Sequence, residues 1–276
     1  MKEVWPWLDR RLIHPPGMLP LGDDPWLTPA RPGSVIERAR RRIIGSGAPH
    51  AIGALPESEG AQRELLDLVV SSVGGTENGQ EMPIARAGLM VEDDLLLLDR
   101  VEGEHVLVAG VLCFPSQWRL DEKLGRSLLS IHDPVVEYDA TLARRVQRLF
   151  DALHPDRPLW RMNWLFYPDG AIETPASERD ETGKGWQRSG RLFIRRERQA
   201  LRRLPRSGAI VFSIRTMVTP VEDLPDDALA ALLPAVGGID ADIAAYKGLE
   251  HAIPRVQAEL ARRQGEANDG QGSGAV

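Results

Sequence analysis

The feature that most constrains the fold is a series of short apolar segments in the middle of the chain, each of strand length. Residues 95–99 and 105–114 flank a turn that contains Gly103, which predicts a β-hairpin. Three further strands are predicted at residues 160–167, 191–199 and 209–218. Between the second and third strands, apolar residues recur at helical spacing over residues 138–153. We therefore predict an α+β fold built on a five-stranded antiparallel sheet with inserted and flanking helices.

The sequence predicts that the chain is divided into four parts. Residues 1–85 form a Pro- and Trp-rich arm and helices, including 35–44 and 62–73, that pack on the core. Residues 86–220 form the core, and residues 170–190 within it are polar and glycine-rich, which is typical of a surface loop. Residues 221–263 contain helices at 223–233 and 240–263, the second interrupted by Pro254. Residues 264–276 are rich in Gly and polar residues and are expected to be disordered.

Composition excludes several classes of protein. A formal net charge of −6 gives no reason to expect nucleic-acid binding. The apolar stretch at residues 209–214 is far shorter than the roughly 20 residues that a membrane-spanning helix needs. The N-terminus lacks the apolar region of a signal peptide, so we expect a cytoplasmic protein. The single cysteine, Cys113, can form neither a disulfide within the chain nor a cysteine-ligated iron–sulfur cluster.

His132 is the candidate metal ligand. It stands where a loop meets the predicted helix at 138–153, and a neutral imidazole there could bind a metal through one ring nitrogen. The histidines form no HxH, HxxH or HExxH spacing, so a multi-histidine zinc site is not indicated. The alternative is that His132 is an ordinary structural histidine.

Cations gather around the fourth predicted strand. Eight arginines lie between residues 188 and 206, and Glu197 is the only acid among them: Arg188, Arg191, Arg195, Arg196, Arg198, Arg202, Arg203 and Arg206. Guanidinium groups bind carboxylates and phosphates in pairs of hydrogen bonds, which favours an anion site. The alternative is a solvated basic face, or a docking surface for an acidic partner.

Arg215 is the one charged residue in the apolar strand at 209–218. A buried guanidinium must be paired, so its partner is either a carboxylate such as Glu197 or a bound ligand. Aromatic residues such as Trp118 and Trp160 usually belong to a core, although one or two could line a flat cofactor. The sequence contains no GxSxG, GxxxxGK[ST] or strand-following GxGxxG motif.

Four segments resemble the family of haem-dependent oxidative N-demethylase alpha subunits, the dimethylamine monooxygenase-like proteins. They begin with His-Pro-Pro-Gly-Met-Leu-Pro-Leu at residue 14 and continue with Phe-Pro-Ser-Gln-Trp-Arg at 114, Glu-Lys-Leu-Gly at 122 and Ile-His-Asp-Pro-Val at 131. Trp-Arg-Met-Asn-Trp follows at 160. The most specific is Arg-Glu-Arg-Gln-Ala-Leu-Arg-Arg-Leu-Pro at 196 with Ile-Val-Phe-Ser-Ile-Arg-Thr at 210.

The resemblance implies a haem b held in a Per-ARNT-Sim (PAS)-like sheet, where oxygen is activated and a methyl group is removed from a small secondary amine. Electrons would come from NADPH through partner subunits that carry FMN and a 2Fe–2S cluster. Carried over by position, His132 becomes the haem ligand, Trp118 a haem contact, and Arg198 and Arg202 the propionate partners. Glu197 and Arg215 become candidates for polarising the substrate or oxygen. The alternatives are a haem-based gas or redox sensor and a haem-free ligand-binding PAS-like protein.

Overall fold

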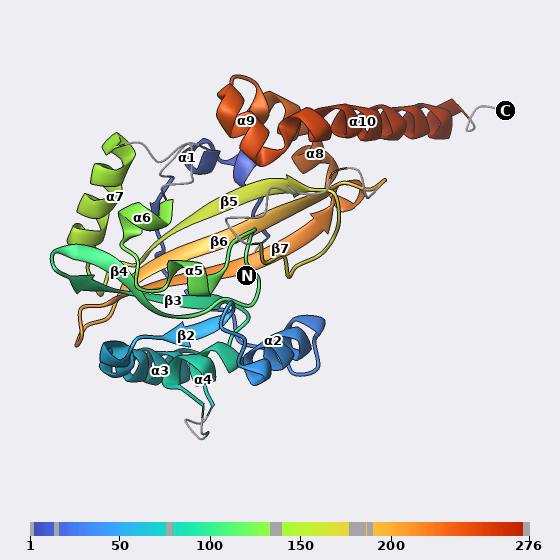
Figure 1. Ribbon diagram of the computed structural model, residues 1–276. Coiled ribbons are helices and arrows are strands. Elements are labelled where there is room, and N and C mark those ends of the chain that lie inside the picture. Colours follow the sequence, from blue (N-terminus) through green and yellow to red (C-terminus); the bar gives the residue numbers. More distant parts are fainter. Residues whose placement is uncertain are drawn as a thin grey trace.

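A seven-stranded antiparallel sheet forms the centre of the molecule (Figure 1). The computed structural model describes residues 3–13, 17–75, 79, 81–132, 140–176, 186 and 190–272, with the backbone alone described for residues 13, 132, 140–144 and 267–272. The strand order is β1-β5-β6-β7-β3-β4-β2. The mixture of helices and strands confirms the α+β class, but the prediction of a five-stranded sheet was wrong.

The five expected strands are the middle ones of the sheet. They are β3 (Asp94–Val101), β4 (Glu104–Val111), β5 (Leu159–Tyr167), β6 (Phe193–Arg203) and β7 (Ile210–Pro220). Two more strands, β1 (Leu19–Pro20) and β2 (Ile52–Ala54), pair with β5 and β4 at the two edges. Segments of two or three residues are too short to show the alternation that identifies a strand, and this explains the error in number.

One face of the sheet carries Leu95, Leu97 and Val211, and we call it the first face. At the β3–β4 end it packs against α2 (Val35–Ser46), α3 (Glu59–Val73) and α4 (Pro83–Leu89). The Ser34 hydroxyl accepts a hydrogen bond from the Glu37 amide at 3.1 Å, and Gly47 ends α2 in the left-handed region. This hydrophobic core therefore joins the predicted N-terminal helices to the sheet.

The other end of the first face packs against α8 (Asp226–Val236), α9 (Ala241–Lys247) and α10 (Leu249–Gly272). Trp7, in the short helix η1 (Pro6–Leu8), donates its indole N–H to the Ala228 carbonyl at 2.7 Å. The one long helix expected at 240–263 is divided, because Gly248 ends α9 with a φ of 74°. The structure continues α10 to Gly272, within the segment for which composition predicts no regular structure.

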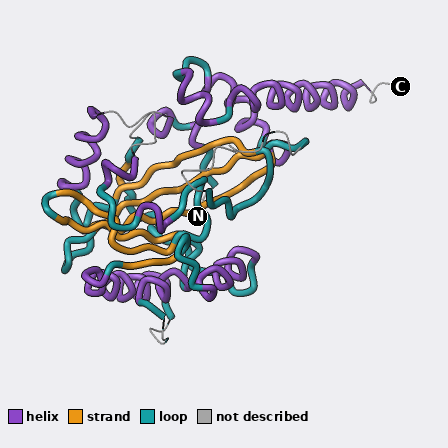
Figure 2. Tube along the Cα trace, in the orientation of Figure 1, coloured by secondary structure: helices purple, strands orange, loops and turns teal. Residues whose placement is uncertain are grey.

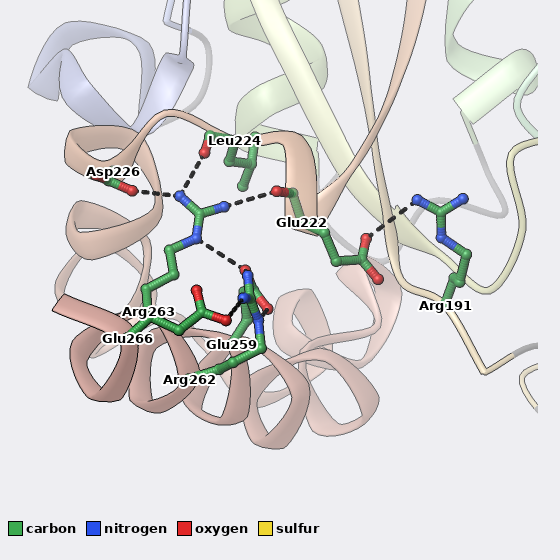
Figure 3. A network of polar contacts seen from close by, with 8 residues as sticks. All are labelled: Arg191, Glu222, Leu224, Asp226, Glu259, Arg262, Arg263 and Glu266. Atoms are coloured by element: carbon green, nitrogen blue, oxygen red, sulfur yellow. Dashed lines mark hydrogen bonds and ion pairs between the residues drawn. The ribbon is translucent and has the colours of Figure 1, made fainter. Parts of the chain in front are cut away.

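A network of ion pairs fastens α10 to the segment before α8 (Figure 3). Arg263 donates to the carbonyls of Leu224 and Glu222, each at 2.8 Å, and to Glu259 at 2.9 Å. Arg262 donates to Glu259 at 2.6 Å. These contacts lie around the short helix η3 (Val221–Asp223), so they fix the direction in which α10 leaves the body.

The opposite face, which carries Leu96, Leu98 and Phe212, is the second face. It is covered by α5 (Leu120–Lys123), α6 (Leu128–His132) and α7 (Ala140–Ala152), so helices lie on both sides of the sheet (Figure 2). Gly110 of β4 allows a close approach here, because a Cβ at that position would lie 2.8 Å from a methyl carbon of Leu120. The segment between β4 and β5 thus forms the layer that covers the second face.

Candidate functional site

Three rows of side chains cross the central strands β5, β6 and β7 on the second face. The rows are Arg161, Gln199 and Ile214; Asn163, Glu197 and Thr216; and Leu159, Leu201 and Phe212. Neighbours in a row lie about 5 Å apart. β6 and β7 are interior strands, yet Gln199 and Phe212 are only half-buried. Among the described residues, the helices therefore leave these two side chains partly exposed.

Apolar side chains from the helical layer border the same rows. Trp118, Leu124 and Ile131 are partly buried and pack against the cluster that contains Leu120 and Ile214. Ile131 lies in α6, and His132 is the last residue of that helix. The side chain of His132 lies outside the described residues, so the helix backbone alone locates this residue. The backbone of α6 brings the candidate ligand beside the partly covered region.

Glu197 is buried on the second face, and neighbours on its own strand hold its carboxylate. Arg195 Nε donates to Glu197 Oε1 at 3.1 Å, and Gln199 Nε2 donates to Glu197 Oε2 at 3.1 Å. Residues two positions apart in a strand share a face, which explains why these three side chains meet. The predicted alternative, an ion pair between Glu197 and Arg215, does not form, because their side chains point to opposite faces.

The segment of residues 114–118, which leads from β4 to α5, is tied down beside Glu197. The Thr174 hydroxyl donates to the Pro115 carbonyl at 2.7 Å, and the Gln117 amide donates to the Thr174 carbonyl at 3.0 Å. The Ser116 hydroxyl lies 2.7 Å from the Tyr167 hydroxyl, and burial raises the pKa of Tyr167. Gln117 has a φ of 60°, an uncommon conformation for a residue other than glycine. Trp118 is thereby held at the end of a fixed segment.

The structure places Arg198, Arg202 and Arg215 on the first face. Arg198 stands directly opposite Arg215 in the β6–β7 pairing. Arg198 donates to the carbonyls of Pro25, at 2.8 Å, and Trp26, at 3.4 Å. The Arg202 guanidinium lies 5.2 Å from the centre of the Trp26 ring. These two arginines therefore hold the N-terminal arm against the sheet.

Arg215 belongs to a buried ionic cluster that the sequence analysis missed. Its Nη2 atom lies 2.8 Å from Glu92 Oε2, and Arg31 Nε lies 2.7 Å from Glu92 Oε1. Asp94 pairs with Arg40 at 2.8 Å, and both side chains are buried. Burial raises the pKa of Asp93, which is fully buried between them, to about 6. Three consecutive acids before the apolar run of β3 were the signal in the sequence that could have revealed this cluster.

The predicted site residues thus divide between the two faces of the sheet. Glu197, Trp118 and the helix that ends at His132 lie on the second face. Arg198, Arg202 and Arg215 lie on the first. One ligand in contact with the second face cannot also contact the three arginines, because the sheet separates them. Arg161, which the sequence analysis did not single out, is the cation that the register places beside Gln199.

Two classes of feature are not found in the described part of the chain. No group of three or more His, Cys, Asp or Glu side chains there is placed to hold a metal ion. Among the described helices, none is both long and apolar enough to cross a membrane. A metal bound through one protein ligand is compatible with the first observation.

Comparison with known protein families shows to which family this chain belongs. A family model described as "haem-dependent oxidative N-demethylase, alpha subunit-like" matches residues 70–257, more than half of the 276 residues. The chain belongs to this family. The match runs from the end of α3 into α10, so it includes all three rows on the second face and, of the ionic cluster on the first, Arg215 and the acids at 92–94. For this N-demethylase-like chain, the family description implies dependence on haem, oxidative removal of a methyl group from nitrogen, and further subunits.

Proposed function

We propose that this chain binds haem b on the second face of the sheet and, with electrons from partner subunits, removes a methyl group from a small secondary amine such as dimethylamine. The observation that carries the proposal is the partly covered region on the interior strands: Gln199 and Phe212 are half-buried there, and Phe212 packs against the same apolar cluster as Ile131 of α6. We also propose that residues 86–220 form the haem-binding core, since they contain the five central strands and the helices α5, α6 and α7, which are inserted between β4 and β5. The electrons would come from NADPH through subunits that carry FMN and a 2Fe–2S cluster.

The residues around this region fit the chemical requirements of a haem. A haem needs one axial protein ligand, apolar contacts for the macrocycle and polar partners for two propionates. His132 is the proposed ligand, and Trp118, Ile131 and Phe212 supply the apolar contacts. Arg161 is the proposed propionate partner, in place of Arg198 and Arg202, because it lies on the same face as these contacts. This assignment uses no group from the first face.

The haem supplies the oxidation: dimethylamine, O₂, two electrons and two protons give methylamine, formaldehyde and water. The chain's own residues bind and orient the amine. Glu197 holds the protonated amine through a charge-assisted hydrogen bond, and Gln199 fixes the orientation of that carboxylate. The helical layer with Trp118 restricts access of water to the same region. Arg215 has no proposed part in catalysis, because it is paired with Glu92 on the other face.

Spectroscopy of the purified full chain, reconstituted with haem, tests the ligand. We expect the wild type to show a Soret band and His132→Ala to lose it while keeping its circular dichroism spectrum. His251→Ala is the matched control, because His251 lies half-exposed on α10, outside the proposed region, and this variant should retain the band. A wild-type Soret band that persists in His132→Ala would reject this ligand assignment.

A titration with dimethylammonium tests the role of Glu197. Amine that binds beside the haem should shift the Soret band of the wild type. Glu197→Gln should keep the haem but weaken amine binding by at least about tenfold, because the charged acceptor is lost. An unchanged dissociation constant in this variant would show that the amine binds elsewhere.

A further inference from the structure

Arg195 is a buried arginine that connects its own strand, β6, to three other segments on the second face. Its Nε atom donates to Glu197 Oε1 at 3.1 Å, and its Nη1 atom donates to the Ile172 carbonyl at 3.0 Å. Its Nη2 atom donates to the Phe114 carbonyl and, at 3.2 Å, to the Thr216 hydroxyl. We propose that Arg195 is the positioning residue for the amine site, holding the Glu197 carboxylate and the Trp118 segment at a fixed separation. This inference rests on the proposed function.

The fork of the guanidinium is what allows one side chain to join these segments. All three nitrogens of Arg195 donate, and the acceptors belong to β6, β7, the 114–118 segment and the loop after β5. A lysine ammonium is a single point charge that can pair with Glu197 but cannot reproduce donors in three fixed directions. Arg195→Lys therefore separates charge pairing from positioning.

The backbone of the 114–118 segment shows that its position is imposed by its contacts. Gln117 has a φ of 60°, a left-handed conformation that is strained for a residue other than glycine. Such a conformation persists where surrounding contacts determine the backbone. Here those contacts are the two hydrogen bonds with Thr174 and the hydrogen bond that Arg195 donates to the Phe114 carbonyl. Trp118 follows directly, so a loss of these contacts would change where its ring lies relative to Glu197.

Arg196, the next residue, provides a matched comparison for a purely structural role. It is equally buried, and it donates to a carboxylate, a carbonyl and a hydroxyl: Glu3 at 2.8 Å, Val4 at 2.8 Å and Thr219 at 3.2 Å. Those groups lie on the first face, where Arg196 holds the N-terminal arm. If Arg195 stabilised the fold and did nothing else, lysine substitutions at the two positions would have the same consequences.

The test uses the full chain reconstituted with haem, with dimethylammonium chloride as the probe. We expect Arg195→Lys and Arg196→Lys to keep the Soret band and to lower the melting temperature by similar amounts. Arg195→Lys should raise the dissociation constant of dimethylammonium by at least about tenfold, while Arg196→Lys should leave it within about twofold of the wild type. The difference in binding at equal loss of stability is the readout that a structural role would not produce.

Two results would overturn the inference: an unchanged dissociation constant in Arg195→Lys, or equal weakening in both variants. Should Arg195→Lys fail to fold, Thr174→Val takes its place, because it removes the hydroxyl that holds the Pro115 carbonyl and leaves Arg195 intact. That variant should weaken amine binding by about threefold or more, and wild-type affinity would again overturn the inference. A wild-type protein without a Soret band would instead reject the proposed function, and this inference with it.

Discussion

Replacement of Asp93 by asparagine should stabilise the protein at neutral and alkaline pH. Asp93 is fully buried, and its Oδ2 atom accepts a hydrogen bond from the Thr28 amide at 2.8 Å. Its Oδ1 atom has no hydrogen-bond partner among the described residues. Asparagine has nearly the same shape and keeps an acceptor for Thr28, so the substitution changes little other than the charge.

The magnitude follows from the pKa of Asp93. Burial raises this pKa from 3.8 to about 6, against the bond from Thr28 and the positive charges of Arg215, Arg40 and Arg198. A raised pKa means that the folded protein binds the proton more tightly than the unfolded chain, so stability falls as the pH rises from about 4 to about 6. Above that range the ionised carboxylate lowers the free energy of unfolding by about 3 kcal/mol. Asp93→Asn should restore this amount. At pH values near or below 4 the two proteins should be equally stable.

Urea unfolding followed by circular dichroism at pH 8, 6 and 4 measures the effect, provided that the dependence on urea is the same for both proteins. Glu64→Gln is the contrasting control. The pKa of Glu64 is lowered, against the effect of burial, by hydrogen bonds from the Arg206 and Ser207 amides, so this variant should be less stable at pH 8. If Asp93→Asn were less stable than the wild type at pH 8, the field of the arginines would outweigh the cost of burial, and the reasoning would fail.

Three other substitutions test the ion pairs of α10 and the packing. The hydrogen bond from Arg262 is the main cause that lowers the pKa of Glu259 to about 2, so Glu259→Gln should speed amide hydrogen exchange in α10, and the difference from the wild type should shrink as the pH falls from 4.5 towards 2. Gly110→Ala should cost about 1–3 kcal/mol in urea unfolding, because the added methyl group would meet Leu120. Gly45→Ala, where a Cβ meets no atom within 4 Å and the residue is in a helix, should instead stabilise by about 0.5–1 kcal/mol.

The central strands could be predicted because each is a run of apolar residues bounded by turns. Leu95–Leu98 contribute to cores on alternate faces, which is why every position in that run is apolar. The edge strands could not be predicted in the same way. Ile52–Ala54 becomes a strand because β4 offers a partner edge, and that edge exists only in the folded sheet.

The candidate site could be predicted in part. Glu197 and Trp118 lie on the same face as α6, and both stand, like His132, in the segments that resemble the family. Arg198 and Arg202 were assigned to the propionates through the resemblance, but their observed partners are Pro25 and Trp26, more than 170 residues away along the chain. No local pattern shows which segment will pack on a strand, so the sequence could not distinguish an arginine that binds a ligand from one that binds a backbone carbonyl.

The arginines of β6 share one structural role: they bind the segments that pack on the two faces of the sheet. Arg196 and Arg198 donate to carbonyls of the N-terminal arm on the first face. Arg195 and Arg203 donate to carbonyls of Phe114, Ile172, Phe150 and Leu153 on the second. Buried carbonyls at the ends of helices and in loops need donors, and long side chains from a central strand can reach them on either side. These arginines of β6 therefore hold the segments that pack on the two faces of the sheet. On the interior strand β6, the polar side chains of the second face that contact no carbonyl of these segments in the described structure are Glu197 and Gln199, and these are the groups we assign to the amine.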